Sequence, residues 1–184
     1  MRIITGRARG LKLATPKSLE VRPTADRVKE TVFNIIGTKI LGADVLDMFA
    51  GTGNLGLESW SRGARKVVFI DKSAASLQLV TGNIRRCRAE SDCAVLKGDA
   101  LAAVRRLAMA GTRFDLAFCD PPYNKGLAQL SVRALAETAF LKKGGYLIVE
   151  RSAHDELSDL PACCSLERSS LFGETVVDFL YYGG

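Results

Sequence analysis

The chain has 184 residues, which is enough for one domain with a full hydrophobic core and too few for two large domains. Hydrophobic residues make up 47% of it and charged residues 25%, a balance typical of soluble globular proteins, and no apolar run approaches the roughly 20 residues of a membrane span. Because the amino terminus turns polar and basic too early for a signal peptide, we expect a cytoplasmic protein that contacts no membrane.

The cysteines and the histidine exclude further classes of protein. Five cysteines form an odd number without a C-x-x-C pair, which argues against a disulfide framework and against a zinc cluster. The single histidine, His154, cannot build a histidine-based metal site alone. We therefore expect free thiols and no bound metal.

The chain begins with a segment that differs from the rest in charge. Residues 2–14 alternate apolar and basic residues around a glycine-flanked turn, which predicts a short hairpin, and a helix is expected to follow and to end at Gly37. Residues 1–39 contain nine Lys or Arg against three acids, so they carry the whole formal net charge of +6. This segment is predicted to be a basic extension (1–39) that contacts a polyanion such as nucleic acid; a merely solvated basic surface is the alternative.

From residue 40 to residue 184 the pattern indicates a second part that alternates strands and helices. Strands are expected at 44–49, 66–71, 93–97, 114–120 and 145–150, and helices near 55–62, 74–89, 101–109 and 126–139. Near-continuous apolar strands separated by helices predict a doubly wound parallel sheet. After a short polar helix or loop, the runs 165–171 and 175–182 predict an antiparallel hairpin at the edge of the sheet. The expected fold is thus an α/β, mostly parallel, seven-stranded Rossmann-like sheet of the methyltransferase kind.

A glycine-rich turn follows the first of these strands. Gly51, Gly53 and Gly56 let the backbone turn tightly and approach a ligand closely at the carboxyl end of the strand. The same glycines, with Asp71 about 20 residues on, also match the dinucleotide pattern G-x-G-x-x-G, so a nicotinamide enzyme remains an alternative. Asp47 favours a positively charged ligand instead, because its carboxylate would repel a pyrophosphate and attract the ammonium and sulfonium of S-adenosylmethionine.

Further acids follow the next two strands. Asp71 is placed to accept hydrogen bonds from ribose hydroxyls, and Asp99 either contacts an adenine amino group beside Ala100 or caps the following helix, two roles that are compatible. The residues expected to bind S-adenosylmethionine are Asp47, Phe49, Ala50, Gly51, Thr52, Gly53, Asp71, Lys72, Asp99 and Ala100.

The candidate catalytic corner is Asp120, Pro121, Pro122 and Tyr123, which follow an apolar strand. An exocyclic amine of a base is a poor nucleophile because its lone pair is delocalised into the ring. The Asp120 carboxylate and a carbonyl near Pro121 could accept its two N–H hydrogens and direct the lone pair at a methyl group, while Tyr123 stacks on a flipped base. Covalent catalysis is not expected, because Cys119 should point into the core on the opposite side of the strand.

Taken together, the motifs resemble those of the bacterial RsmD family. The resemblance is carried by residues 2–6 (R-I-I-T-G), 22–30 (R-P-T-A-D-R-V-K-E), 47–53 (D-M-F-A-G-T-G), Asp71 and 120–123 (D-P-P-Y). It implies methylation of guanine N2 in 16S small-subunit ribosomal RNA, with S-adenosylmethionine as cofactor and catalysis at residues 120–123. Thr52 and Asn54 stand where the family pattern would have Ser and Ala.

The resemblance also implies that the basic extension contacts RNA, either free or within the assembled small ribosomal subunit. The expected contacts are Arg7, Arg9, Lys12, Arg22, Arg27 and Lys29. We expect a monomer. Methylation of adenine N6 or cytosine N4 in RNA or DNA remains an alternative, a nicotinamide-dependent reductase leaves the D-P-P-Y corner without a purpose, and a noncatalytic RNA-binding protein explains only the charge.

Overall fold

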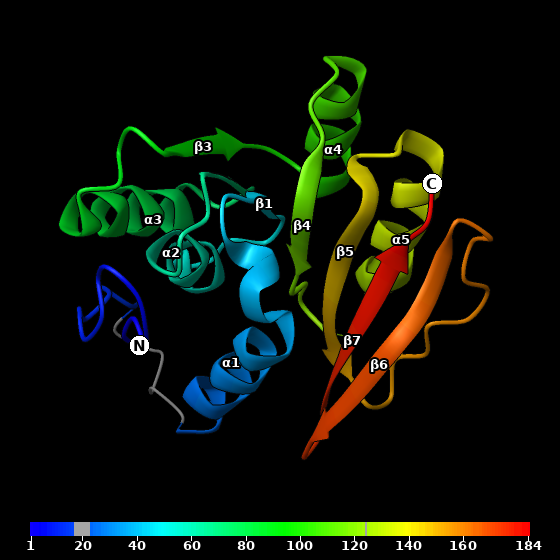
Figure 1. The fold of residues 1–184 in the computed structure, drawn as a ribbon, viewed down its shortest axis with the longest axis horizontal. Coiled ribbons are helices and arrows are strands. Elements are labelled where there is room, and N and C mark those ends of the chain that lie inside the picture. Colours follow the sequence, from blue (N-terminus) through cyan, green and yellow to red (C-terminus); the bar gives the residue numbers. More distant parts are fainter. Residues whose placement is uncertain (17–22, 124) are drawn as a thin grey trace.

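A seven-stranded sheet forms the centre of the protein in the computed structural model, which describes residues 1–16, 23–123 and 125–184 (Figure 1). Its strand order is β3-β2-β1-β4-β5-β7-β6. The first five strands are parallel, and β7 is antiparallel to both of its neighbours. The strands are β1 (Asp44–Asp47), β2 (Lys66–Asp71), β3 (Cys93–Lys97), β4 (Phe114–Cys119), β5 (Leu141–Ser152), β6 (Cys164–Phe172) and β7 (Thr175–Tyr182). The predicted fold class is confirmed.

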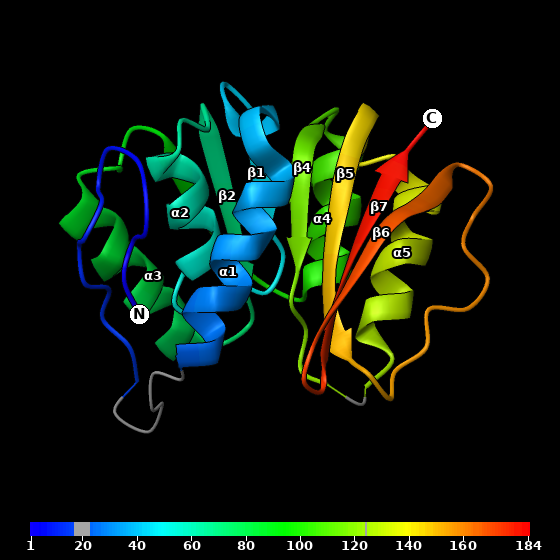
Figure 2. The ribbon, with the colours of Figure 1, turned by 60° about the horizontal axis from the view of Figure 1, so that its bottom comes forward.

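Helices cover both faces of this sheet. Figure 2 shows α1, α2 and α3 in front of the strands and α4 and α5 behind them. The helices are α1 (Pro23–Ile36), α2 (Asn54–Ser61), α3 (Ala74–Cys87), α4 (Ala100–Met109) and α5 (Leu127–Thr138), with a short 3-10 helix η1 (Gly37–Ile40) after α1. Because apolar side chains leave the central strands on both faces, the core divides into two clusters, one under each layer of helices.

The amino-terminal segment packs onto the first of these clusters. Residues 2 and 12 form an antiparallel bridge, the compact form of the predicted hairpin. Ile3 and Leu13 from this hairpin and Phe33 from α1 lie in the same buried cluster as Val45 of β1. The extension and the sheet therefore share a hydrophobic core, although the charge divides the chain near residue 39.

The carboxyl-terminal hairpin extends the sheet beyond its parallel part. The short connection between β6 and β7 predicted an antiparallel hairpin at the edge of the sheet, which is confirmed. β7 inserts between β5 and β6, so β6 forms the outer edge. β5 is longer than expected and reaches Ser152, and the described residues 153–163 form turns and loop rather than a helix. None of the helices in the described ranges has both the length and the apolar character to cross a membrane.

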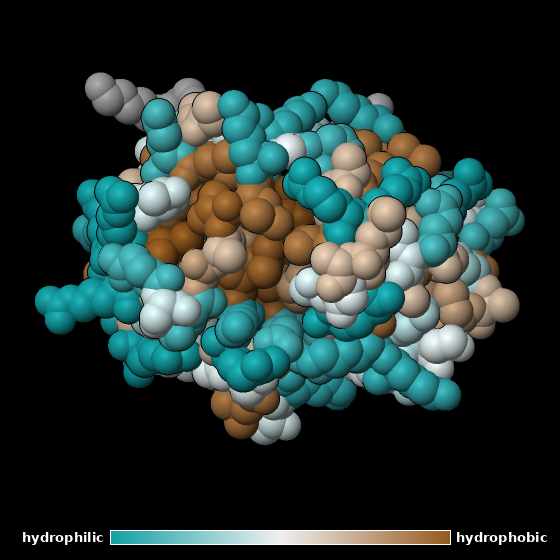
Figure 3. All heavy atoms as spheres, turned by 90° about the horizontal axis from the view of Figure 1, so that it is seen from above, coloured by the Kyte–Doolittle hydropathy of each residue, from teal (hydrophilic) through white to brown (hydrophobic). Residues whose placement is uncertain are grey.

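Some hydrophobic side chains stay at the margin of the second cluster rather than inside it, among them Val68, Leu96 and Leu101. The space-filling view from above shows a hollow lined by hydrophobic residues and bordered by hydrophilic ones (Figure 3). Apolar surface is thus not confined to the two enclosed clusters.

Candidate active site

Two cavities meet at the carboxyl ends of the parallel strands. The larger one has a volume of about 570 Å³ and is bounded by α1, the glycine turn and the tip of the β6–β7 hairpin. The smaller one, about 500 Å³, lies over the ends of β2 and β3. Both are lined by Phe49, Gly51, Asp120 and Tyr123. A molecule in one cavity would therefore reach a molecule in the other at these four residues.

The glycine turn between β1 and α2 separates the two cavities. Gly51 and Gly53 have φ angles of +54° and +78°, which L side chains rarely adopt, and Gly53 immediately precedes α2. Gly56, in the first turn of α2, lies directly against β2: a Cβ there would approach Phe69 Cε1 to 2.2 Å. These glycines let the chain reverse tightly and let α2 pack on the sheet. Of the expected cofactor residues, Gly53 lines neither cavity and shapes the turn instead.

Asp47 lies at the end of β1 beneath this turn. Its side chain is buried, and its Oδ2 accepts a hydrogen bond from the Gly56 N–H at 3.0 Å. Burial raises the pKa of Asp47 to about 7, and the nearby Asp71 charge adds to the rise, while the Gly56 bond opposes it. A buried carboxylate with so little compensation favours a positively charged group beside it. Asp47 lines the larger cavity, where such a group can enter.

Acids at the ends of β2 and β3 line the smaller cavity. Asp71 accepts hydrogen bonds from the backbone N–H groups of Gly51 at 2.9 Å and Ser73 at 2.8 Å, so it also holds the glycine turn in place. Asp99 caps α4 by accepting from Ala102 N–H at 3.0 Å, which is one of the two roles predicted for it. Lys72 and Ala100 line the same cavity, whereas Ala50 and Thr52 line the larger one.

The D-P-P-Y corner follows β4 at the junction of the cavities. Asp120 faces open space there, yet protein surrounds that space, and the loss of hydration raises the pKa of Asp120 well above its ordinary value. The negative charges of Glu150 and Asp47 raise it further. Next to it, Pro121 is buried and Pro122 is exposed. Cys119 is buried as predicted, and burial raises the pKa of its thiol to about 12, so it is no nucleophile.

Tyr123 completes the corner. Its hydroxyl donates to Glu150 Oε1 at 2.9 Å and lies 3.2 Å from the Thr175 hydroxyl, while its side chain remains 38% exposed. Glu150 was not among the residues expected from the sequence. The signal was available, because β4 and β5 were both expected to be parallel strands, and their carboxyl ends meet at the same edge of the sheet.

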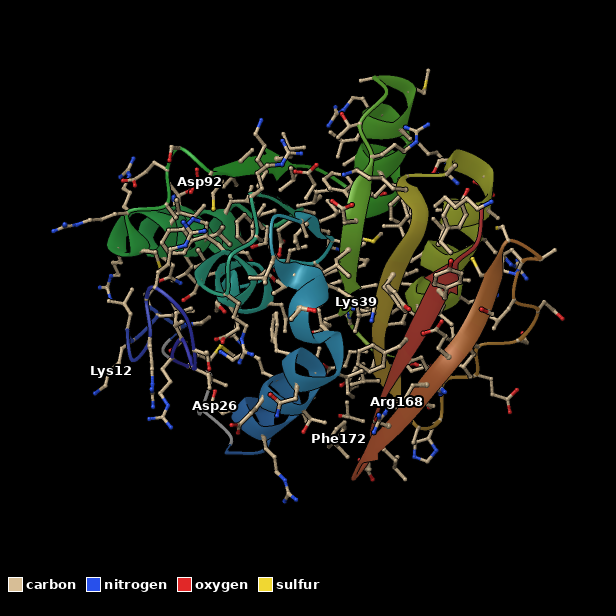
Figure 4. The ribbon with its side chains drawn as sticks, viewed as in Figure 1. Lys12, Asp26, Lys39, Asp92, Arg168 and Phe172 are labelled. Atoms are coloured by element: carbon tan, nitrogen blue, oxygen red, sulfur yellow. The ribbon has the colours of Figure 1, made fainter. Side chains whose placement is uncertain are left out.

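Among the described residues of the extension, the basic side chains differ in exposure and in their contacts. Arg9, Lys12 and Arg27 are exposed, and Figure 4 shows Lys12 on the hairpin, directed away from the sheet. Arg7 makes contacts within the protein: its guanidinium donates to the backbone carbonyl of Trp60 at 3.0 Å and lies over the indole ring of Trp60. Arg22 falls outside the described residues.

Lys29 requires a correction. It was expected to contact RNA, but its side chain is buried, because its ammonium is held by the Glu58 carboxylate at 3.3 Å. It also donates to the carbonyl of Arg2 at 2.6 Å and to Asn54 Oδ1 at 2.7 Å. Lys29 therefore joins the hairpin, α1 and α2 from inside the protein and presents no charge to a phosphate on the surface.

The residues present fit the predicted cofactor. The smaller cavity offers carboxylates at the ends of two strands, and Gly51, which has no side chain, lines both cavities where they meet. Asp47 supplies a buried carboxylate that accepts a hydrogen bond from the Gly56 N–H. These carboxylates suit a ligand that carries hydroxyl groups at one end and positive charge at the other.

Comparison with known proteins places the chain in a family. The family model described as "Conserved hypothetical protein 95" matches residues 1–181. The chain belongs to this family. The protein named "Ribosomal RNA small subunit methyltransferase D" of Escherichia coli (strain K12) is 36% identical over 95% of this chain and 86% of its own length. Its namesake in Haemophilus influenzae is 35% identical over 82% of this chain and 78% of its own length.

Solved structures give the same result. A structure from Escherichia coli is 34% identical and has a TM-score of 0.88, covering 99% of this chain and 97% of that one. One from Haemophilus influenzae is 29% identical and has a TM-score of 0.82, covering 100% and 98%. The resemblance to the RsmD family and the methyltransferase fold are thereby confirmed, and S-adenosylmethionine is the cofactor.

Proposed function

We propose that this protein transfers a methyl group from S-adenosylmethionine to the exocyclic N2 amine of a guanine in 16S ribosomal RNA of the small subunit. The names of the relatives support ribosomal RNA of the small subunit as the substrate. The observation that carries the chemistry is the place of Asp120, which lines both cavities at the point where they join.

The smaller cavity holds the nucleoside end of the cofactor in this proposal. Asp71 binds the ribose hydroxyls, Asp99 and Ala100 face the adenine, and Asp47 neutralises positive charge at the other end. When bound, S-adenosylmethionine supplies an electrophilic methyl group on a sulfonium sulfur. Lys72, Phe49, Gly51 and the glycine turn enclose it and exclude water from the junction.

The larger cavity receives the base. Asp120 and the carbonyl of Pro121 accept the two N–H hydrogens of the amine, which turns the nitrogen lone pair toward the junction. Asp120 is also the carboxylate placed to take the proton that the nitrogen loses. Tyr123 stacks on the base. Because a protonated Asp120 cannot accept a proton, the rate should decline as the pH falls through its raised pKa.

The lining of the larger cavity favours guanine. Besides Asp47, which is assigned to the cofactor, three carboxylates line it, those of Asp120, Glu150 and Glu174. Guanine presents three N–H hydrogens at its Watson–Crick edge, two on N2 and one on N1, and therefore suits a wall of acceptors. Where guanine has the N1–H donor, adenine and cytosine have an acceptor ring nitrogen, N1 and N3 respectively, which these carboxylates would repel. Methylation of adenine N6 or cytosine N4 is accordingly the weaker alternative.

RNA contact is assigned to the exposed cations of the extension. Arg9, Lys12 and Arg27 supply it among the described residues, with Arg7 through the part of its guanidinium that remains exposed. Because so small a protein offers few side chains that could read the bases of the RNA, a folded RNA or the assembled small ribosomal subunit is recognised by its shape. We propose that the protein acts on it as a monomer.

The experiment that tests this function compares two neutralised aspartates. Asp120→Asn is expected to cost about 2 to 4 kcal/mol of transition-state stabilisation, roughly 100-fold or more in rate, while cofactor binding persists. Asp159→Asn, on the distant loop before β6, serves as the matched control and should retain the wild-type rate. Near wild-type turnover of Asp120→Asn with intact cofactor binding would refute the proposed role.

A further inference from the structure

Glu150 is a carboxylate at the active site that the sequence motifs do not contain. It lies near the end of β5, where the register pairs Phe118 with Ile148 and Cys119 with Val149. Continuing this register places Glu150 beside Asp120. Its side chain is half-buried and lines the larger cavity. A carboxylate there lies beside the junction and is not needed to accept the amine hydrogens.

The contacts of Glu150 connect it to Tyr123. The phenol donates to Glu150 Oε1 at 2.9 Å and lies 3.2 Å from the Thr175 hydroxyl on β7. A carboxylate on β5 and a hydroxyl on the adjacent β7 therefore fix the phenol end of a ring that lines both cavities. The corner that carries Tyr123 follows β4 as irregular backbone, so these side-chain bonds restrict the ring where regular secondary structure does not.

Resting on the proposed function, we propose that Glu150 is a positioning residue for methyl transfer: it fixes the ring of Tyr123 for stacking and keeps a negative charge beside Asp120. The fixed ring holds the base in line with the junction, and the charge makes Asp120 a stronger proton acceptor than an isolated carboxylate. Neither role requires Glu150 to touch the reacting atoms.

Other charged groups line the same two cavities. Asp47 of β1 adds a second like charge to Asp120, and Glu174 lies at the tip of the β6–β7 hairpin. Lys29 of α1 borders the larger cavity, but Glu58 neutralises it. Toward the smaller cavity lie Asp71, Lys72 and Asp99. After burial, Glu150 contributes most to the raised pKa of Asp120, so its removal has a measurable signature.

The test uses Glu150→Gln and Tyr123→Phe. The glutamine keeps an oxygen that accepts from the phenol but removes the charge, whereas the phenylalanine keeps the ring but removes the bond. The matched control is Glu167→Gln, because Glu167 also accepts from a tyrosine, Tyr146, at 2.8 Å, and lies outside both cavities. All variants are first compared by thermal unfolding.

The first readout requires no substrate. Carbon-13 NMR of selectively labelled aspartate follows the titration of Asp120, assigned by its loss in Asp120→Asn. In Glu150→Gln the pKa of Asp120 should fall, because a neighbouring like charge is removed, and the acidic limb of kcat should move to lower pH with it. Glu167→Gln should shift neither the pKa of Asp120 nor the acidic limb of kcat.

The second readout uses RNA as substrate. Tyr123→Phe should raise KM for RNA about tenfold and leave cofactor binding unchanged.

An unshifted Asp120 titration in Glu150→Gln, or an equal shift in Glu167→Gln, would overturn the proposal. So would a Tyr123→Phe variant with wild-type KM. Failure of the proposed function appears differently: wild-type protein that binds the cofactor and methylates no guanine would refute it, while the titration would still show whether Glu150 acts on Asp120.

Discussion

Replacing Lys29 by methionine tests whether this lysine holds the fold together or contacts RNA. The change removes an ammonium that contacts the Glu58 carboxylate, the Arg2 carbonyl and Asn54. Breaking a buried ion pair costs about 3 to 5 kcal/mol, because the remaining charge is left without its partner. Glu58 keeps an ion pair with Arg62 at 2.7 Å, so we expect a loss near the lower limit, roughly 3 kcal/mol. For a chain of this length that lowers the unfolding midpoint by about 6 to 12 °C.

The assay has two parts. Urea unfolding gives the change in stability, with Arg9→Ala as the control, because Arg9 is exposed and should shift the free energy of unfolding by no more than about 0.5 kcal/mol. RNA binding is then measured against salt at a temperature where both variants are folded. Lys29→Met should keep the wild-type salt dependence. An unchanged unfolding midpoint together with a shallower salt dependence would show that Lys29 contacts phosphate and would refute the structural role.

Three further predictions follow from single features of the structure. Gly56→Ala should destabilise the protein in urea unfolding by about 1 to 3 kcal/mol, because its Cβ would overlap the ring carbons of Phe69. The control is Gly82→Ala, whose Cβ meets no atom within 4 Å and should not destabilise the protein. Equal unfolding midpoints for the two variants would contradict this prediction. Burial raises the pKa of Asp47 to about 7, so its ionisation opposes folding, and the stability of the cofactor-free protein should fall as pH rises from about 4 to 7. Asp47→Asn should remove most of that decline, which amounts to at most about 4 kcal/mol. A variant with the same pH profile of stability as the wild type would exclude Asp47 as the cause of the decline. If three exposed cations contact phosphates, RNA affinity should fall roughly 20-fold between 50 and 200 mM salt, and replacing both Arg9 and Lys12 by alanine should flatten that dependence; no change in slope would remove them from the interface.

The sequence was sufficient for most of the fold because its signals are local. Apolar runs separated by amphipathic helices predicted β1 to β4 within two residues of their observed bounds, and the tight connection at Gly173 predicted the β6–β7 hairpin. The bounds of β5 were predicted too narrowly, at 145–150, whereas the strand runs from Leu141 to Ser152. Its ladder with β7 extends the strand to Ser152, and such a pairing leaves no local signal.

The candidate site was predictable where a motif carries it and not elsewhere. Asp120 and Tyr123 were found because the motif marks them, and the structure places them at the junction of two cavities. Glu150 was missed because its role depends on a neighbouring strand. Lys29 was misassigned because charge alone does not distinguish a surface cation from one that is buried against an acid of another helix. Its partner Glu58 lies on α2, and the sequence pattern gives no sign of that contact.

The central claim is that Asp120 directs methylation to guanine N2. Its most direct test is transfer of labelled methyl from S-adenosylmethionine to undermethylated small ribosomal subunits and to their free RNA, followed by digestion to nucleosides. N2-methylguanosine from either substrate, absent with Asp120→Ala, is the predicted result. Label in N6-methyladenosine or N4-methylcytidine, or N2-methylguanosine formed equally well by Asp120→Ala, would contradict the account.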